Sequence, residues 1–123
     1  KVHEAKEAGA DHVQIWGSGT PRREFLHADD CADALVHLIK TYSGEAPVNV
    51  GSGEDLTIEA LVRMIMEIVG FDGALTRAET KPDGPPRKLM TADRLRALGW
   101  SPTLSLRAGL EHAYACFLEE QAR

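Results

Sequence analysis

The chain has 123 residues, of which 43% are hydrophobic and 27% charged, a balance typical of a globular protein rather than a disordered or fibrous one. Its formal net charge of −5 argues against a nucleic-acid partner, because duplex binding normally requires an excess of basic residues. No apolar run approaches the roughly 20 residues of a membrane span, and no charged-then-apolar leader opens the sequence, so no membrane partner is expected.

The cysteines and histidines predict no disulfide and no metal site. Cys31 and Cys116 lie far apart, each within a helical apolar pattern, and we expect both to be buried free thiols in a reducing, cytoplasmic compartment. A disulfide between them is the less favoured alternative. The histidines show no ligand spacing, and His27 is interpreted as a packing or hydrogen-bonding residue.

The sequence opens on a helix signal. Residues 1–8 favour a helix that ends at Gly9, and no capping residue precedes it, so we expect the chain to be a fragment of a longer protein. Residues 12–16 predict a short strand with Val13 and Ile15 on one face, and residues 24–27 are a candidate for a second strand.

A helix and another strand are expected next. Asp29 or Asp30 is the predicted cap of a helix that ends near residues 42–44. Its inward positions recur every three or four residues: Cys31, Ala34, Leu35, Leu38 and Ile39. Residues 47–53 predict a short buried strand that runs into a glycine turn.

The clearest helix signal follows Thr57, the predicted N-cap. Gly70 stands where a left-handed residue ends such a helix, and the apolar stripe between them consists of Ile58, Leu61, Val62, Ile65, Ile68 and Val69. Residues 74–80 are a candidate strand. Residues 81–88 are expected to lack regular structure, because three prolines and a glycine interrupt both ladders and helices.

Two more helices complete the order of elements. A short helix over residues 91–98 should stop at Gly99, with Trp100 placed for a hydrophobic contact. Ser105 is the predicted cap of the last helix, whose inward residues are Leu106, Leu110, Ala113 and Phe117. Helices that alternate with short strands indicate an α/β architecture.

The stretch from Trp16 to Asp30 contains the residues of an anion-binding loop. Arginine presents paired donors that match phosphate oxygens, and the nearby glycines let backbone approach a ligand. Only one of Arg22 and Arg23 can face inward in an extended segment. The alternative is a solvated arginine pair with Glu24 as its partner.

Other polar groups also have two readings. Trp16 could stack on a base or sugar, or it could be a core or rim residue. Asp29 and Asp30 could be an acid pair, although helix capping accounts for them without chemistry. A second cluster lies on the irregular loop at residues 81–88, where ligand contact and solvated charge are both open; it comprises Lys81, Asp83, Arg87 and Lys88.

No cofactor fingerprint is present. The glycine runs at residues 17–19 and 51–53 do not complete the dinucleotide pattern of three glycines that opens a helix. A nucleophile elbow and a phosphate-binding loop with lysine are also absent.

Three segments together resemble the C-terminal part of the GDP-L-fucose synthase family: residues 16–30, 47–53 and 81–89. The resemblance covers nearly the whole chain and implies the substrate-binding portion, at residues 1–123, of an extended short-chain dehydrogenase/reductase. That superfamily has an NAD(P)-binding Rossmann-like fold, whose N-terminal half would be absent here. The tryptophan before the loop and the Lys-Pro-Asp-Gly loop are more particular to this family than the arginine and Asp-Asp signature.

The resemblance implies roles for five residues. Arg23 resembles the arginine that grips the substrate pyrophosphate, and Trp16 the aromatic contact to the GDP portion. Lys1 stands at a basic substrate contact, Asp83 at an acidic residue of the substrate loop, and Lys81 is a weaker candidate in that loop. Pro85 replaces a frequent threonine, which is expected to stiffen the loop without removing a contact.

The same resemblance implies that the catalytic and cofactor-binding residues lie upstream of Lys1. The complete enzyme would be a homodimer that epimerises and reduces GDP-4-keto-6-deoxy-D-mannose to GDP-L-fucose with NADPH. This chain alone, without its N-terminal cofactor domain, would be inactive. Two alternatives stay open: part of another nucleotide-sugar epimerase or dehydratase, and a stand-alone anion-binding interaction module.

Overall fold

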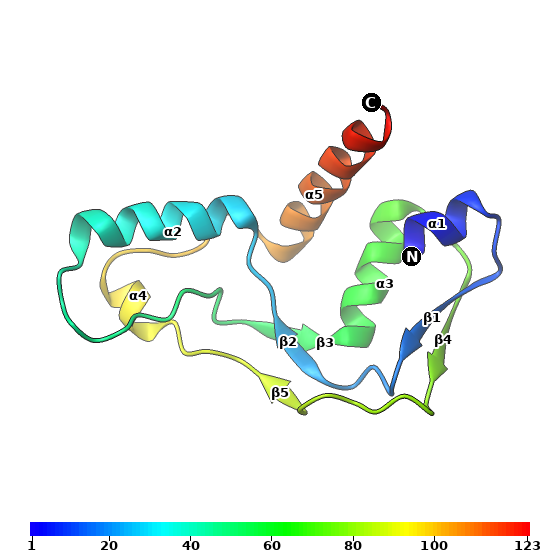
Figure 1. Ribbon diagram of the computed structural model, residues 1–123, viewed down its shortest axis with the longest axis horizontal. Helices are drawn as coiled ribbons and strands as arrows, with labels where there is room; N and C mark the ends of the chain where they lie inside the picture. Colours follow the sequence, from blue (N-terminus) through cyan, green and yellow to red (C-terminus); the bar gives the residue numbers. More distant parts are fainter.

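The computed structural model describes residues 1–123. It contains helices and strands in this order: α1 (Val2–Glu7), β1 (His12–Trp16), β2 (Arg22–Glu24), α2 (Ala28–Thr41), β3 (Asp55–Thr57), α3 (Ile58–Val69), β4 (Ala74–Ala78), β5 (Arg87–Lys88), α4 (Asp93–Ala97) and α5 (Leu106–Gln121). Figure 1 shows an elongated arrangement, with α1, α3, β1 and β4 at one end and α2 and α4 at the other.

Two small sheets connect these elements. β1 pairs with β4 in parallel, with Trp16 opposite Ala78 at the end of the ladder. The second sheet has the order β3-β2-β5, in which β2 pairs antiparallel with β3 and parallel with β5. This second sheet lies between the two ends of the molecule in Figure 1. Its three strands come from segments that are far apart in the sequence.

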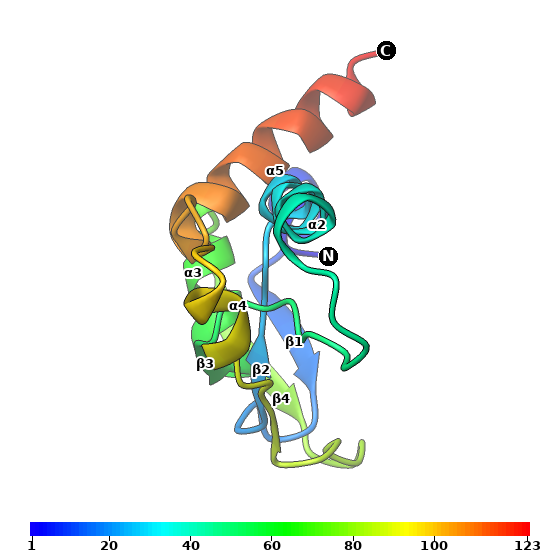
Figure 2. The ribbon, with the colours of Figure 1, turned by 90° about the vertical axis from the view of Figure 1, so that its left-hand side faces the viewer.

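Each end has its own hydrophobic core. At the α3 end, the buried residues are Val13, Met66, Val69 and Phe71. At the α2 end, they are Ala34, Leu95 and Trp100. Helix α5 packs against α3, and its second half projects away from both cores (Figure 2).

Several expected elements are confirmed. The strand at residues 12–16 has its predicted bounds, with Val13 and Ile15 buried. Thr57 caps α3 by accepting a hydrogen bond from the Ala60 N–H, and Gly70 ends that helix with φ of +71°. Ser105 caps α5 in the same way. Side-chain caps at these positions satisfy backbone donors that the helix leaves unpaired.

Three predictions about strands and loops are wrong. The strand expected at residues 24–27 lies at residues 22–24, because its partners β3 and β5 end there. Residues 47–53 do not form a strand, since no other strand lies beside them to supply a hydrogen-bond ladder. The loop expected at residues 81–88 contains the two-residue strand β5, which pairs with β2.

The cap predicted at Asp29 or Asp30 is also wrong. His27 caps α2, and its Nδ1 accepts a hydrogen bond from the Asp29 N–H at 3.1 Å. Asp30 is only 3% exposed and accepts hydrogen bonds from Thr103 and from the Leu104 N–H. The hydroxyl of Thr103 is the main reason that the pKa of Asp30 lies below its ordinary value. Asp30 therefore connects α2 to the segment that precedes α5.

The apolar patterns overestimate burial. On α2, Ala34 is buried, whereas Leu35 is half exposed and Ile39 is 83% exposed. On α5, Ala113 and Phe117 are exposed, and so is Cys116, which was expected to be buried. Cys31 is half-buried, and both thiols are free, as predicted. These helix faces are only partly covered; on α5, the His3 ring lies edge-on to Phe117 with the ring centroids 5.1 Å apart. None of the helices has the length and apolar content that a membrane crossing requires.

Candidate functional site

The candidate site lies where β1 and β4 end. Because the two strands are parallel and Trp16 is opposite Ala78, the loops that follow both strands leave the same edge of the sheet. The Gly17 N–H continues the ladder by donating to the Ala78 carbonyl at 3.1 Å. Gly17 has φ of +74°, in the left-handed region that favours glycine. This turn directs residues 17–21 toward the loop at residues 81–88.

Asp83 joins these two loops. The Ser18 N–H donates to Asp83 Oδ1 at 2.8 Å, and the Ser18 hydroxyl donates to Asp83 Oδ2 at 2.6 Å. The hydroxyl hydrogen bond is the leading cause that lowers the pKa of Asp83. The carboxylate is therefore ionised at neutral pH and holds the second loop against the first.

Trp16 is exposed, and two lysines flank it. Its side chain is 66% exposed, which excludes the reading as a core residue. Lys1 Nζ lies 5.0 Å from the centroid of its ring, and Lys81 Nζ lies 5.4 Å from it. Both distances are within the range of cation–π attraction. The arrangement presents an aromatic plane and two ammonium groups on one surface.

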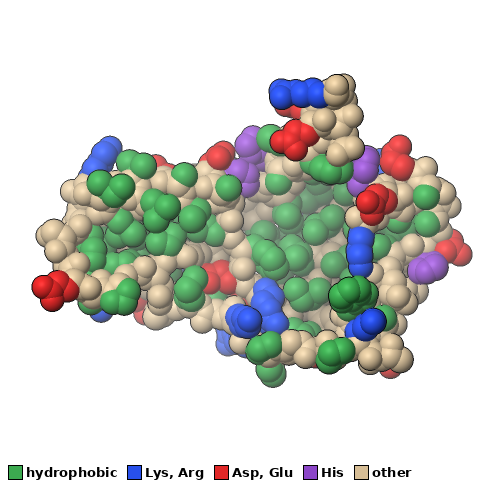
Figure 3. All heavy atoms as spheres, in the orientation of Figure 1, with side chains coloured by type: hydrophobic (Ala, Val, Ile, Leu, Met, Phe, Trp, Pro, Cys, Tyr) green, Lys and Arg blue, Asp and Glu red, His purple; other side chains and the backbone are tan.

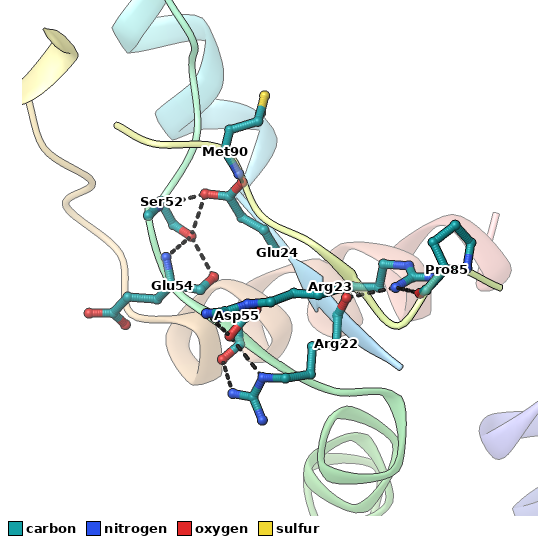
Figure 4. Close-up of polar contacts among 10 residues, drawn as sticks. Arg22, Arg23, Glu24, Ser52, Glu54, Asp55, Pro85 and Met90 are labelled. Carbon is teal, nitrogen blue, oxygen red and sulfur yellow. Dashed lines mark hydrogen bonds and ion pairs between the residues drawn. The ribbon is translucent and has the colours of Figure 1, made fainter. Parts of the chain in front are cut away.

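The two arginines have different partners, as Figure 4 shows. Arg23 Nη1 donates to the Arg22 carbonyl at 2.7 Å and to the Pro85 carbonyl at 2.8 Å. No hydrogen bond involves Nε or Nη2 of Arg23, so these donors are available to an anion. The Arg23 guanidinium is therefore positioned by the loop that carries Asp83.

Arg22 forms ion pairs instead. Its Nε lies 3.0 Å from Asp55 Oδ1, and Arg87 Nε lies 2.5 Å from Asp55 Oδ2. Arg87 is the leading cause that lowers the pKa of Asp55, and Arg22 adds to it. This pairing connects all three strands of the second sheet, and it gives Arg22 and Arg87 a structural role.

Glu24 is not the partner of the arginine pair. Its Oε1 accepts a hydrogen bond from the Gly53 N–H at 2.6 Å, and its Oε2 accepts one from the Met90 N–H at 3.4 Å (Figure 4). A Cβ on Gly51 would lie 2.5 Å from Glu24 Oε1, so the glycine leaves room for the carboxylate. The sequence offered one signal for this contact, namely the glycine turn at residues 51–53.

A hollow of about 700 Å³ lies elsewhere, between the start of α2, the segment at residues 101–106 and the first half of α5. Its lining is partly apolar, and Figure 3 shows hydrophobic side chains gathered between α5 and the body of the molecule. None of the five candidate residues lines it. Sequence patterns did not predict this hollow.

The described residues do not form a dinucleotide site. The glycine run at residues 17–19 leads into β2, and the run at residues 51–53 leads into β3, so neither opens a helix. A pyrophosphate at a helix N-terminus requires that strand–glycine–helix order. Neither glycine run therefore provides the pyrophosphate-binding turn of a nicotinamide dinucleotide site.

Comparison with known proteins supports the resemblance inferred from the sequence. Residues 1–51 match the model of the NAD dependent epimerase/dehydratase family. Putative GDP-L-fucose synthase 2 of Arabidopsis thaliana is 54% identical over 97% of this chain and 36% of its own length. GDP-L-fucose synthase 1 of the same plant is 52% identical over 97% of this chain and 37% of its own length. The chain thus spans about a third of the length of these relatives.

The fold agrees with this comparison. A GDP-L-fucose synthetase from Naegleria fowleri, solved with NADP bound, superposes with a TM-score of 0.92 over 98% of this chain and 38% of that one. Its 22% identity makes this a likeness of fold alone. The α/β fold class of the extended short-chain dehydrogenases/reductases, C-terminal part, is therefore confirmed.

Proposed function

Because this chain has the sequence and the fold of the C-terminal part of the GDP-L-fucose synthases, we propose that residues 1–123 are the substrate-binding portion of such an enzyme. The complete enzyme epimerises and reduces GDP-4-keto-6-deoxy-D-mannose to GDP-L-fucose with NADPH. The observation that carries this proposal is the 54% identity over 97% of the chain. It is supported by the grouping of four candidate residues beside the ends of β1 and β4, namely Trp16, Lys1, Lys81 and Asp83, and by the hydrogen bond from Arg23 on β2 to Pro85 of the same loop.

In this proposal Arg23 binds the substrate pyrophosphate. Its free Nε and Nη2 offer a planar pair of donors, and the Pro85 carbonyl holds the guanidinium in place through Nη1. A guanidinium that is already oriented loses less entropy when it binds an anion. Because Arg23 donates a hydrogen bond to Pro85, the position of the loop at residues 81–88 determines where the guanidinium meets the phosphates.

Trp16 contacts the nucleotide portion of the substrate. Its exposed ring supplies a flat apolar surface, and the two neighbouring lysines add positive charge beside a ligand that carries two phosphates. Lys1 and Lys81 therefore serve as basic substrate contacts. Asp83 contributes by holding the substrate loop in register through Ser18.

Catalysis and cofactor binding are assigned to the part of the enzyme that this chain does not contain. No residue of the chain is given a catalytic role, and NADP is proposed to bind the N-terminal domain of the complete enzyme. The chain clamps the substrate, which keeps the reacting sugar in a fixed position. Assembly as a homodimer and a cytoplasmic location are further parts of the proposal.

The test uses the full-length protein, purified and mixed with GDP-4-keto-6-deoxy-D-mannose and NADPH. We expect NADPH oxidation and formation of GDP-L-fucose. Failure on this sugar, together with activity on another nucleotide sugar, would instead support a different epimerase or dehydratase of the same superfamily. The residue 1–123 fragment, titrated with GDP and with GDP-mannose, is the second arm. Weak or no binding is expected, and tight binding would favour a stand-alone anion-binding module.

A further inference from the structure

Two histidines and an aspartate meet where the start of α2 faces α5. His27, Asp29 and His112 each place one potential ligand atom within 4.8 Å of the other two. Their spacing in the sequence, 2 and then 83 residues, gives no metal signature, so this cluster arises only from the fold. Figure 3 shows histidine side chains side by side at this junction.

The close approach of the two helices depends on a glycine. Gly109 is buried in α5, and a Cβ on it would lie 3.3 Å from Cδ2 of His27. The absence of a side chain therefore lets the His27 ring pack directly on α5. His112 follows Gly109 by three residues, on the same face of the helix. The two imidazole rings lie with their centroids 5.1 Å apart as a result.

The hydrogen bonds fix where the imidazole protons lie. His27 Nδ1 accepts from the Asp29 N–H, so the proton of a neutral His27 is on Nε2. His27 Nε2 lies 3.1 Å from His112 Nδ1 and donates to it. His112 then carries its own proton on Nε2, which lies 3.7 Å from Cys116 Sγ. One proton is thus held between two facing imidazole nitrogens.

We propose that this cluster is a binding site for a divalent transition metal of the zinc class, with His27, His112 and Asp29 as ligands. Two nitrogens bound to tetrahedral zinc at about 2.0–2.1 Å each are separated by roughly 3.3 Å, close to the spacing observed here. Imidazole and carboxylate groups are suitable zinc ligands. The ion takes the place of the proton between the rings.

Metal binding changes the neighbouring hydrogen bonds in a defined way. The proton on His27 Nε2 is released to solvent and one is taken up from solvent at Nδ1, so His27 stays neutral with no net change in bound protons. The hydrogen bond from the Asp29 N–H to Nδ1 is given up. Cys116 lies against the outer nitrogen of His112 and accepts its N–H, which keeps the lone pair of Nδ1 directed at the metal. Cys116 is therefore a positioning residue and not a ligand.

The experiment titrates the chelator-treated full-length protein with Zn²⁺ by calorimetry, and repeats the titration with Co²⁺ followed by visible absorption. One equivalent of each metal is expected to bind. His112→Gln and Asp29→Asn should each weaken binding by about tenfold or more, because each removes one ligand. Both residues are exposed, so the variants should fold.

The matched control is His12→Gln. His12 also has an aspartate beside it, with Nδ1 2.6 Å from Asp11 Oδ1, but it faces no second imidazole, so its loss should leave metal affinity unchanged. Cys116→Ser should retain the stoichiometry. Absence of stoichiometric binding by the unmodified protein, or equal binding by the His112→Gln variant, overturns the proposal. Neither outcome bears on the proposed enzymatic function, which this site does not enter.

Discussion

Asp83 accepts two hydrogen bonds from Ser18, one from its backbone N–H at 2.8 Å and one from its hydroxyl at 2.6 Å. The two residues are 65 positions apart, and they hold the loops after β1 and β4 together. Arg23 donates a hydrogen bond to the Pro85 carbonyl of the second loop. The Ser18–Asp83 contact, which holds that loop, therefore also helps to position the Arg23 guanidinium. The candidate site therefore depends on loop-to-loop contacts as well as on its exposed side chains.

Removal of this contact is expected to weaken substrate binding. In the full-length enzyme, Asp83→Ala and Ser18→Ala should each raise KM, Asp83→Ala more strongly because it removes the acceptor of both hydrogen bonds. Steady-state kinetics on the double variant provide the check. The combined effect should be smaller than the sum of the single effects, and additive effects would show that the residues act independently.

Gly17→Ala should destabilise the protein more than Gly9→Ala. Both glycines have positive φ, but a Cβ on Gly17 would overlap Asp83 Oδ1 and displace that carboxylate from Ser18, whereas a Cβ on Gly9 meets nothing within 4 Å. Gly9→Ala should lower the free energy of unfolding by only about 1 kcal/mol, because alanine disfavours the left-handed backbone conformation. The midpoint of thermal unfolding measures the difference. Equal losses would contradict a close contact between Gly17 and Asp83.

Asp30→Asn is expected to lower the free energy of unfolding by about 1–3 kcal/mol at pH 7, because an amide presents a donor to Thr103 or Leu104, which are themselves donors. The pKa of Asp30 is lowered in the folded state, so its contribution is present above the ordinary aspartate pKa of about 4. That contribution is lost as the pH falls through the folded pKa.

The difference in stability between the unmodified protein and Asp30→Asn should therefore shrink below about pH 4. Urea unfolding from pH 3 to pH 7 measures it. Asp72→Asn serves as the control, since Asp72 is exposed and makes no side-chain hydrogen bond, and it should change stability little at any pH. A pH-independent loss for Asp30→Asn would mean that the charge of Asp30 is not what stabilises the fold.

Local signals in the sequence predicted the elements whose ends depend on a cap or a glycine, such as α3 between Thr57 and Gly70. They failed where the outcome depends on distant residues. The cap of α2 is His27 because its ring packs against Gly109, and residues 47–53 lack a neighbouring strand. No local pattern contains that information.

The same distinction between local and distant information applies to the candidate site. The residue types around Trp16 and Arg23 indicated anion binding, and the family resemblance singled out Arg23. The choice between the arginines by geometry needed the structure, because Asp55, which pairs with Arg22, lies 33 residues away in the sequence. The roles of Glu24 and of the His27–His112 pair likewise depend on partners brought close only by folding.

The most direct test of the central claim is the kinetics of Arg23→Ala in the full-length enzyme with GDP-4-keto-6-deoxy-D-mannose. Loss of a charged hydrogen-bond pair to the pyrophosphate should raise KM by about 10- to 100-fold and change kcat by less than about threefold. Arg63→Ala, which removes an exposed partner of Glu59, should leave both constants unchanged. A KM for Arg23→Ala equal to that of the unmodified enzyme would contradict the claim that this loop binds the substrate.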